Sequence, residues 1–150
     1  MRMATVVLFL ALASGCGPES RDALRCTSET DTDPILDESF TVRYHDSATI
    51  RSEALTLTFA ELVSDSRCPA GDACAVGGSA NVEITASQTG QEPATLELAS
   101  RSEGVPPLGQ TEATYGGYTI ALISVVPYPE TGRTIQPTDY CVGLRVSNEQ

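Results

Sequence analysis

The chain has 150 residues, a length that fits one domain, and carries 20 acidic residues against nine basic ones, all of which are arginine. The net charge of −11 excludes binding to nucleic acid or anionic lipid by electrostatic attraction alone. With a single histidine, the chain also offers few side chains that titrate near neutral pH for acid–base catalysis.

Residues 1–15, with the sequence MRMATVVLFLALASG, have the features of a signal peptide. Arg2 supplies the positive charge, and the apolar run from Val6 to Ala13 has the length of a signal-peptide core but is too short to span a bilayer. Small residues then lead into Cys16. This segment resembles the lipobox of bacterial lipoproteins, which implies that Cys16 is diacylated and becomes the new N-terminus.

Cysteine parity supports the lipobox interpretation. The alternative is an ordinary secretory signal that is cut after Ala13, and this would leave five cysteines that cannot all pair in an oxidising compartment. Acylation of Cys16 leaves four. We therefore expect a membrane contact through a lipid anchor in the bacterial envelope, and Gly17 indicates, by the same resemblance, the outer membrane. A protein without the acyl group would be secreted or periplasmic.

Residues 16–38 are acidic and hold few large apolar side chains, which predicts a solvated, lipid-anchored tether. The Asp-Thr-Asp run that begins at Asp31 is similar to the start of a calcium loop. It lacks the central glycine and the closing glutamate of an EF-hand, so we expect a charged linker and no metal site.

After residue 38, apolar and polar residues alternate with the period of two that is typical of half-buried strands. Turn residues such as Gly77-Gly78 and Pro106-Pro107 separate the runs. The pattern predicts an all-β domain over residues 39–150, an antiparallel β-sandwich or small barrel of six to seven strands. The clearest runs are residues 40–44, 55–59, 80–85, 96–98, 118–126 and 140–146.

The segment from Asp65 to Cys74 reads D-S-R-C-P-A-G-D-A-C. It resembles a motif, D-S-R-C-P-x-G-x-x-C, of a family of small uncharacterised bacterial envelope and secreted proteins. Pro127-Tyr128-Pro129 and a final strand led by Tyr140 match the same family further along. The resemblance implies the fold and the disulfide but no activity.

The cysteine segment also has a direct physical interpretation. Pro69 fixes one backbone angle and Gly71 permits a positive φ, so the residues between the cysteines can fold back. Asp65 and Arg67 flank the loop and are expected to pair across its base. One hypothesis is a stapled strand connection with a surface ion pair. A second is a rigid recognition loop, with candidate residues Asp65, Arg67, Pro69, Gly71, Asp72 and, from the distant hairpin, Tyr128. A third, a redox site, is disfavoured because the chain has no C-x-x-C motif.

Once Cys16 is set aside, four cysteines allow three connectivities. A Cys68–Cys74 pair is favoured because the short loop keeps the two residues close. A Cys26–Cys141 pair then follows by elimination, and it would bring the two ends of the mature chain together.

Two further groups of residues are candidates for function. A Ser/His/Asp triad would have to use His45, the only histidine. Four tyrosines gather in the last third of the chain and could form a contact patch. Of these we expect Tyr118 and Tyr140 to be cross-strand core partners instead. The four are Tyr115, Tyr118, Tyr128 and Tyr140.

The sequence therefore predicts a non-enzymatic, lipid-anchored envelope protein with a binding or structural role, without cofactor, metal or nucleic acid. Its expected partner is an envelope protein or polymer. The alternatives are a protease inhibitor that uses the Cys68–Cys74 loop and a small hydrolase that uses His45. The hydrolase requires His45 to lie within hydrogen-bond reach of a serine and an aspartate.

Overall fold

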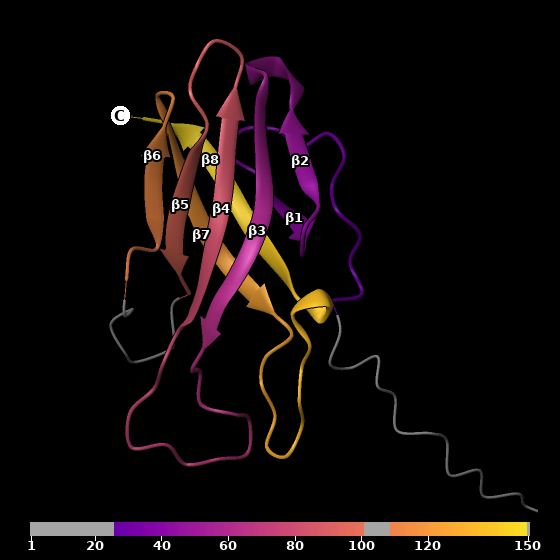
Figure 1. The fold of residues 1–150 in the computed structure, drawn as a ribbon, viewed down its shortest axis with the longest axis vertical. Coiled ribbons are helices and arrows are strands. Elements are labelled where there is room, and N and C mark those ends of the chain that lie inside the picture. The colour runs from indigo at the N-terminus through magenta and orange to yellow at the C-terminus, as the bar shows by residue number, and fades with distance from the viewer. Residues whose placement is uncertain (1–25, 101–108, 150) are drawn as a thin grey trace, which may run out of the picture.

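In the computed structural model, which describes residues 26–100 and 109–149, two antiparallel sheets of four strands pack face to face (Figure 1). The predicted β-sandwich is confirmed. The predicted signal peptide and Cys16 lie outside the described residues. The strands are β1 (Ser39–Arg43), β2 (Ser47–Ile50), β3 (Leu55–Asp65), β4 (Ala80–Gln88), β5 (Ala94–Ala99), β6 (Glu112–Tyr115), β7 (Tyr118–Val126) and β8 (Cys141–Asn148).

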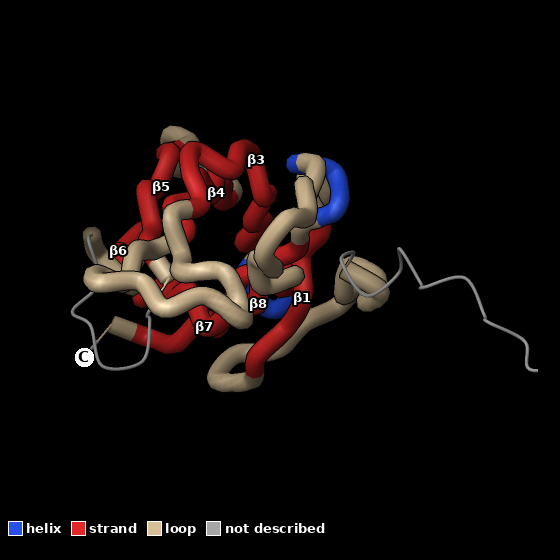
Figure 2. Tube along the Cα trace, turned by 90° about the horizontal axis from the view of Figure 1, so that it is seen from below, coloured by secondary structure: helices blue, strands red, loops and turns tan. Residues whose placement is uncertain are grey.

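One sheet has the strand order β1-β8-β7-β6 and the other β2-β3-β4-β5, and Figure 2 shows the two layers from one end. Alternate side chains on each strand point between the layers, where they lose all or nearly all contact with water. Burial of these groups is the main source of stability. The largest of them include Ile50, Leu55, Leu57, Phe59, Ile84, Leu98, Ile120 and Leu144.

The described chain has eight strands, which exceeds the expected six to seven, because β2 and β6 are short and carry weak apolar patterns. β2 buries only Ala48 and Ile50, and it follows a tight turn in which His45 has a φ of 66°. β6 joins β7 through Gly116-Gly117, both with positive φ. A two-residue Gly-Gly connection is a hairpin signal, and it could have revealed β6 from the sequence.

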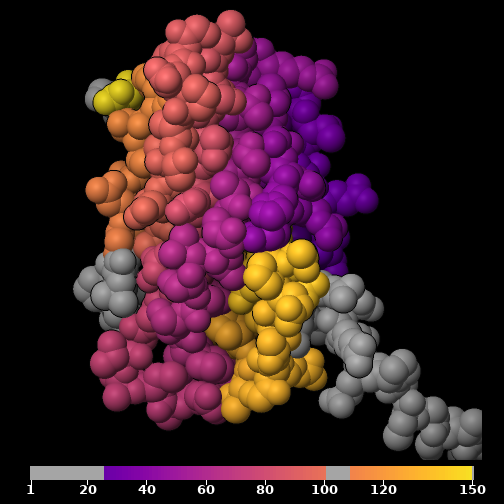
Figure 3. Space-filling view, in the orientation of Figure 1, coloured from indigo at the N-terminus to yellow at the C-terminus, as the bar shows by residue number. Residues whose placement is uncertain are grey.

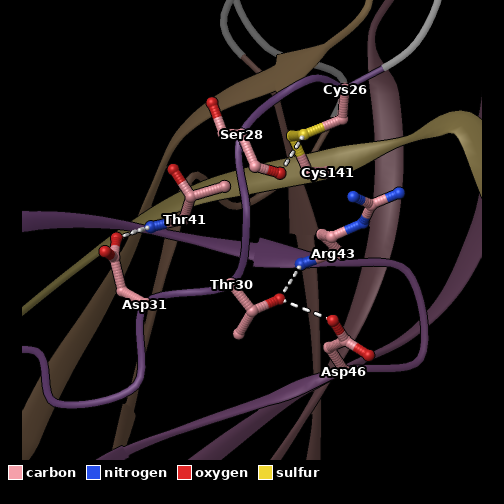
Figure 4. The surroundings of a disulfide bond; sticks show 8 residues. All are labelled: Cys26, Ser28, Thr30, Asp31, Thr41, Arg43, Asp46 and Cys141. Atoms are coloured by element: carbon pink, nitrogen blue, oxygen red, sulfur yellow. Dashed lines mark hydrogen bonds between the residues drawn. A yellow bond between two sulfur atoms is a disulfide. The ribbon is translucent and has the colours of Figure 1, made fainter.

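Residues 26–38 are not a free tether. The amide of Asp31 donates to the carbonyl of Thr41 (2.9 Å), and the amide of Thr41 donates to the Asp31 carboxylate (2.7 Å) (Figure 4). The amide of Arg43 donates to the hydroxyl of Thr30 (3.0 Å). The segment thereby satisfies main-chain groups of β1, an edge strand that would otherwise be open to pairing with another chain. It belongs to the sandwich domain.

Candidate functional site

Two long loops project from the same end of the sandwich (Figures 1 and 3). One, residues 66–79, joins β3 to β4, and the other, residues 127–140, joins β7 to β8. The amide of Ala70 donates to the carbonyl of Pro129 (2.8 Å), and the hydroxyl of Thr131 donates to the carbonyl of Ala70 (3.4 Å). We call these two loops the paired-loop end.

Arg67 joins the two loops beneath their surface. Its guanidinium donates to both carboxylate oxygens of Asp65, through Nε (2.8 Å) and Nη2 (2.6 Å). Nη1 donates to the carbonyl of Val125 (2.5 Å) and Nη2 also donates to the carbonyl of Pro127 (2.8 Å). A single side chain thus connects the end of β3 in one sheet with the end of β7 in the other.

The expected pair of Asp65 and Arg67 is present, but it is not a surface ion pair. The side chains of Arg67 and Asp65 are only 4% and 9% exposed. Taking two charges out of water is costly unless each finds several partners. Here the main-chain carbonyls and the aromatic rings around the pair supply those partners, so the pair forms a structural connection between the sheets.

Two tyrosines complete this cluster. The buried Tyr140 donates its hydroxyl to Asp65 (2.9 Å), while the ring of Tyr128 covers the guanidinium with its centre 4.7 Å from the Arg67 Cζ. Burial and the neighbouring Asp65 carboxylate raise the pKa of Tyr140 to about 12. Burial alone would raise the pKa of Asp65, but the bonds from Arg67 and Tyr140 outweigh it and lower that pKa. The carboxylate is therefore charged and the tyrosine neutral at physiological pH.

The loop above the cluster is closed by the Cys68–Cys74 disulfide, which confirms the predicted pair. Gly71 has a φ of +96°, as its expected role requires, and the amide of Asp72 donates to the carbonyl of Pro69 (3.1 Å). Every residue from 70 to 76 is exposed. The loop therefore presents a surface that the sandwich does not use for its own packing.

The base of this loop is closed by two serines. The amide and the hydroxyl of Ser66 both donate to the carbonyl of Ser79 (3.0 Å each), and the amide of Ser79 donates back to the Ser66 hydroxyl (3.2 Å). Gly78 lies so close that an added Cβ would be 2.0 Å from the carbonyl oxygen of Ser66. Only glycine fits at this position.

The second predicted disulfide, Cys26–Cys141, is also present, with the two Cα atoms 5.6 Å apart (Figure 4). Cys141 is the first residue of β8 and faces Val126, the last residue of β7. The amide of Cys26 donates to the carbonyl of Asp139 (2.7 Å). The described chain therefore enters the sandwich at the paired-loop end. Its last strand runs from there to Asn148 at the opposite end, so the expectation that this bridge brings the two chain ends together is wrong.

The recognition-loop candidates fall into two groups. Asp72 and Tyr128 are exposed, with half-buried Pro69 and exposed Gly71 beside them, whereas Asp65 and Arg67 lie beneath and hold the loops together. The structure separates the tyrosines that the sequence grouped. Tyr118 faces Asn148 at one end of β8, and Tyr140 precedes Cys141 at the other end, so the expected cross-strand pair is wrong. Antiparallel register places them at opposite ends of the sheet.

In the part of the chain that the structure describes, the geometry around His45 does not form a triad. The imidazole is exposed in the β1–β2 turn and stacks on Tyr44 with the ring centres 4.0 Å apart. Among the described residues, no serine or aspartate side chain makes a hydrogen bond with it. Within residues 26–100 and 109–149, no group of three His, Cys, Asp or Glu side chains is placed to hold a metal ion.

No helix in the described ranges is long and apolar enough to cross a membrane. Comparison with family models, with curated proteins and with solved structures found no match to this chain. The family resemblance of the cysteine segment stays a prediction.

Proposed function

We propose that this chain is a lipid-anchored protein of the bacterial envelope, attached through Cys16, that acts by binding and not by catalysis. Its contact surface is the paired-loop end. The observation that carries this proposal is the buried Arg67, which donates to Asp65, Val125 and Pro127 and so fixes two exposed loops against each other. The class of partner is an envelope component that meets this end of the sandwich.

The loops are suited to binding because they are held in one arrangement before any partner arrives. Ordering a loop on binding reduces affinity, and a disulfide, a proline or a tightly bonded base removes that cost. All three are present here, in the Cys68–Cys74 bridge, Pro69 and the Ser66–Ser79 bonds. Exposed Tyr128 lies beside them, and tyrosine is one of the side chains enriched in binding hot spots.

Cysteine usage supports the anchor. The two disulfides account for four of the five cysteines, and the remaining one is Cys16, directly after the predicted signal peptide. Acyl chains contribute about 0.8 kcal/mol for each buried CH₂ group, so two or three chains on Cys16 would hold the protein on a bilayer without a transmembrane helix.

Two experiments in living cells test this proposal. Wild-type protein should fractionate with membranes and the Cys16→Ser variant should be released from them. A photo-crosslinking amino acid at exposed Asp72 should give a discrete adduct, with protein or lipid, whereas the same group at Thr85 on the outer face of β4 should not. A soluble wild type would contradict the anchor, and adducts from Thr85 alone would contradict the choice of surface.

A protease inhibitor is the second candidate, and one observation favours it. The exposed Cys68–Cys74 loop is supported from the side by the Ala70–Pro129 hydrogen bond, as a rigid insert for a protease cleft would need to be. The test is inhibition of a panel of serine and cysteine proteases by the soluble domain and by a loop variant with Ala73→Asp. Inhibition that this variant loses would support the candidate, and no inhibition of any class would remove it.

A further inference from the structure

The described chain enters the sandwich at Cys26, beside the paired-loop end, and its last strand ends on the opposite side. Cys26 is fixed to Cys141 at the start of β8 and to the carbonyl of Asp139 in the second loop. The last strand then runs the whole length of the sandwich, to Asn148, which faces Tyr118 at the far end (Figure 1). An anchor that precedes Cys26 therefore attaches to one particular end of the molecule.

The length of the connecting segment limits how the anchored molecule can stand. Nine residues separate Cys16 from Cys26. When fully extended, the ten Cα–Cα steps from Cys16 to Cys26 span at most about 36 Å. The eight residues of β8 cover roughly 26 Å by themselves. For the far end to touch the membrane, the segment would have to run back along the entire sandwich in a largely extended form.

On the basis of the proposed anchor at Cys16, we propose that the paired-loop end faces the bilayer and that Val76 and Tyr128 contact its interfacial region. The occupant of this surface is thus the membrane that holds the acyl chains. An acyl anchor that precedes Cys26 brings the two loops close to the lipid headgroups. The anchor also holds the loops at the membrane, so the loops need no high affinity of their own for lipid.

The chemistry of the first loop and of Tyr128 fits this neighbour. Val76 is 77% exposed and Tyr128 is 47% exposed. Both are large apolar side chains of the kind that usually pack inside a protein, so their exposure leaves apolar surface available for a neighbour. Asp72 is the single charged residue between Pro69 and Ser79, and the rest of that stretch is small or apolar. Tyrosine is enriched at the level of lipid headgroups, where its ring meets acyl chains and its hydroxyl meets water.

The broad faces of the sandwich are less compatible with a membrane. Glu61, Glu83 and Glu97 lie opposite one another across β3, β4 and β5, on the outer face of that sheet. The segment along the edge of β1 adds five acids, Glu29, Asp31, Asp33, Asp37 and Glu38. Anionic lipids repel both surfaces. An upright molecule, which stands on its loops, keeps these acids away from the bilayer.

The absence of tryptophan makes a direct test available. Two single-tryptophan variants are prepared in acylated form from membranes: Val76→Trp at the paired-loop end and Thr89→Trp in the exposed β4–β5 turn at the far end. Each is reconstituted into phosphatidylcholine vesicles whose acyl chains carry bromine near the headgroup. Bromine quenches only nearby tryptophan, and unbrominated vesicles serve as the reference.

The expected result is a loss of Val76→Trp fluorescence in brominated vesicles and no loss for Thr89→Trp. Vesicle-bound protein with neither tryptophan quenched would overturn the orientation, leave the anchor intact and point to an envelope protein or polymer at the loops. Equal quenching at both positions would also overturn it, because the molecule would then lie flat. Protein that lacks the acyl groups or stays off the vesicles would contradict the proposed function itself. Tyr128→Trp, which keeps an aromatic ring over Arg67, repeats the measurement at the second contact residue.

Discussion

Asp65 and Arg67 form a bidentate ion pair, at 2.8 and 2.6 Å, that is buried at the junction of the two sheets although the residues are only two positions apart. The same guanidinium donates to Val125 and Pro127 in the opposite sheet and its outgoing loop. The pair therefore determines how the two loops lie relative to each other.

Removal of Arg67 should destabilise the domain strongly. Arg67→Met leaves the Asp65 carboxylate buried without its counter-charge, and breaking one partner of a buried pair costs about 3–5 kcal/mol. The matched control is Arg133→Met, because Arg133 pairs with Glu130 at the surface (3.4 Å) and exposed pairs contribute about 0–1 kcal/mol. Urea unfolding at pH 7 measures both. Equal losses for the two variants would show that the buried pair has no special role.

Tyr140 should make stability fall at high pH. Its pKa is raised from the ordinary value of 10.0 to about 12, so its contribution is complete below pH 10 and is lost as the pH rises through 12. Tyr140→Phe should cost about 1 kcal/mol at neutral pH, through the lost bond to Asp65, and should show a smaller decline between pH 10 and 12.

Urea unfolding at pH 7, 10 and 11.5 gives the comparison for Tyr140. Tyr128→Phe is the control, since it keeps the ring over Arg67 and removes a hydroxyl from a half-exposed side chain. If Tyr140→Phe lost stability at high pH as steeply as the wild type, the hydroxyl of Tyr140 would not be the group responsible.

Loss of the long disulfide should cost more than loss of the short one. Chain-entropy arguments give about 4.8 kcal/mol for the loop closed by Cys26–Cys141 and about 2.4 kcal/mol for the loop closed by Cys68–Cys74. Cys26 is well fixed, being 6% exposed and bonded through its amide to Asp139, so the long bridge connects two ordered groups. Thermal unfolding of the two double Cys→Ala variants checks the order. A lower melting temperature for the variant without Cys68–Cys74 would reverse it.

Gly78→Ala should disrupt the base of the cysteine loop. The added Cβ would stand 2.0 Å from the Ser66 carbonyl oxygen, which is main chain and has little freedom to move. Overpacking of this kind costs about 1–3 kcal/mol and sometimes more. Gly132→Ala is the control, because no atom lies within 4 Å of its added Cβ and only the positive φ of 73° opposes it. Hydrogen exchange at the Ser66 amide should rise in the first variant alone.

The sequence is sufficient to predict the layered fold and the Cys68–Cys74 disulfide because these features rest on local signals. Alternation of apolar and polar residues marks the long strands, and the short Pro/Gly loop brings Cys68 to Cys74. Once the short loop is closed, the Cys26–Cys141 pair follows from cysteine parity. The strands β2 and β6 are four residues long and carry only a weak alternating pattern, so this pattern does not predict them.

The arrangement of the site depends on long-range contacts that no local pattern contains. Asp65 and Arg67 are expected at the surface because charged residues rarely lie buried, and only the ends of β7 and β8 provide the carbonyls and the Tyr140 hydroxyl that make burial possible. The contact between Ala70 and Pro129, 59 positions apart, is likewise decided by the packing of the two sheets. The composition of residues 26–38 predicts a solvated segment. In the structure, main-chain groups and short polar side chains hold this segment on β1, and no apolar pattern in the sequence marks such contacts.

Attachment through Cys16 is tested most directly by the intact mass of the protein extracted from membranes with detergent. We expect a mature chain that begins at Cys16, carries a diacylglyceryl group with or without a third acyl chain, and contains both disulfides. An unmodified chain that begins at Ser14, recovered in the soluble fraction, would contradict the anchor and the membrane-facing orientation that depends on it.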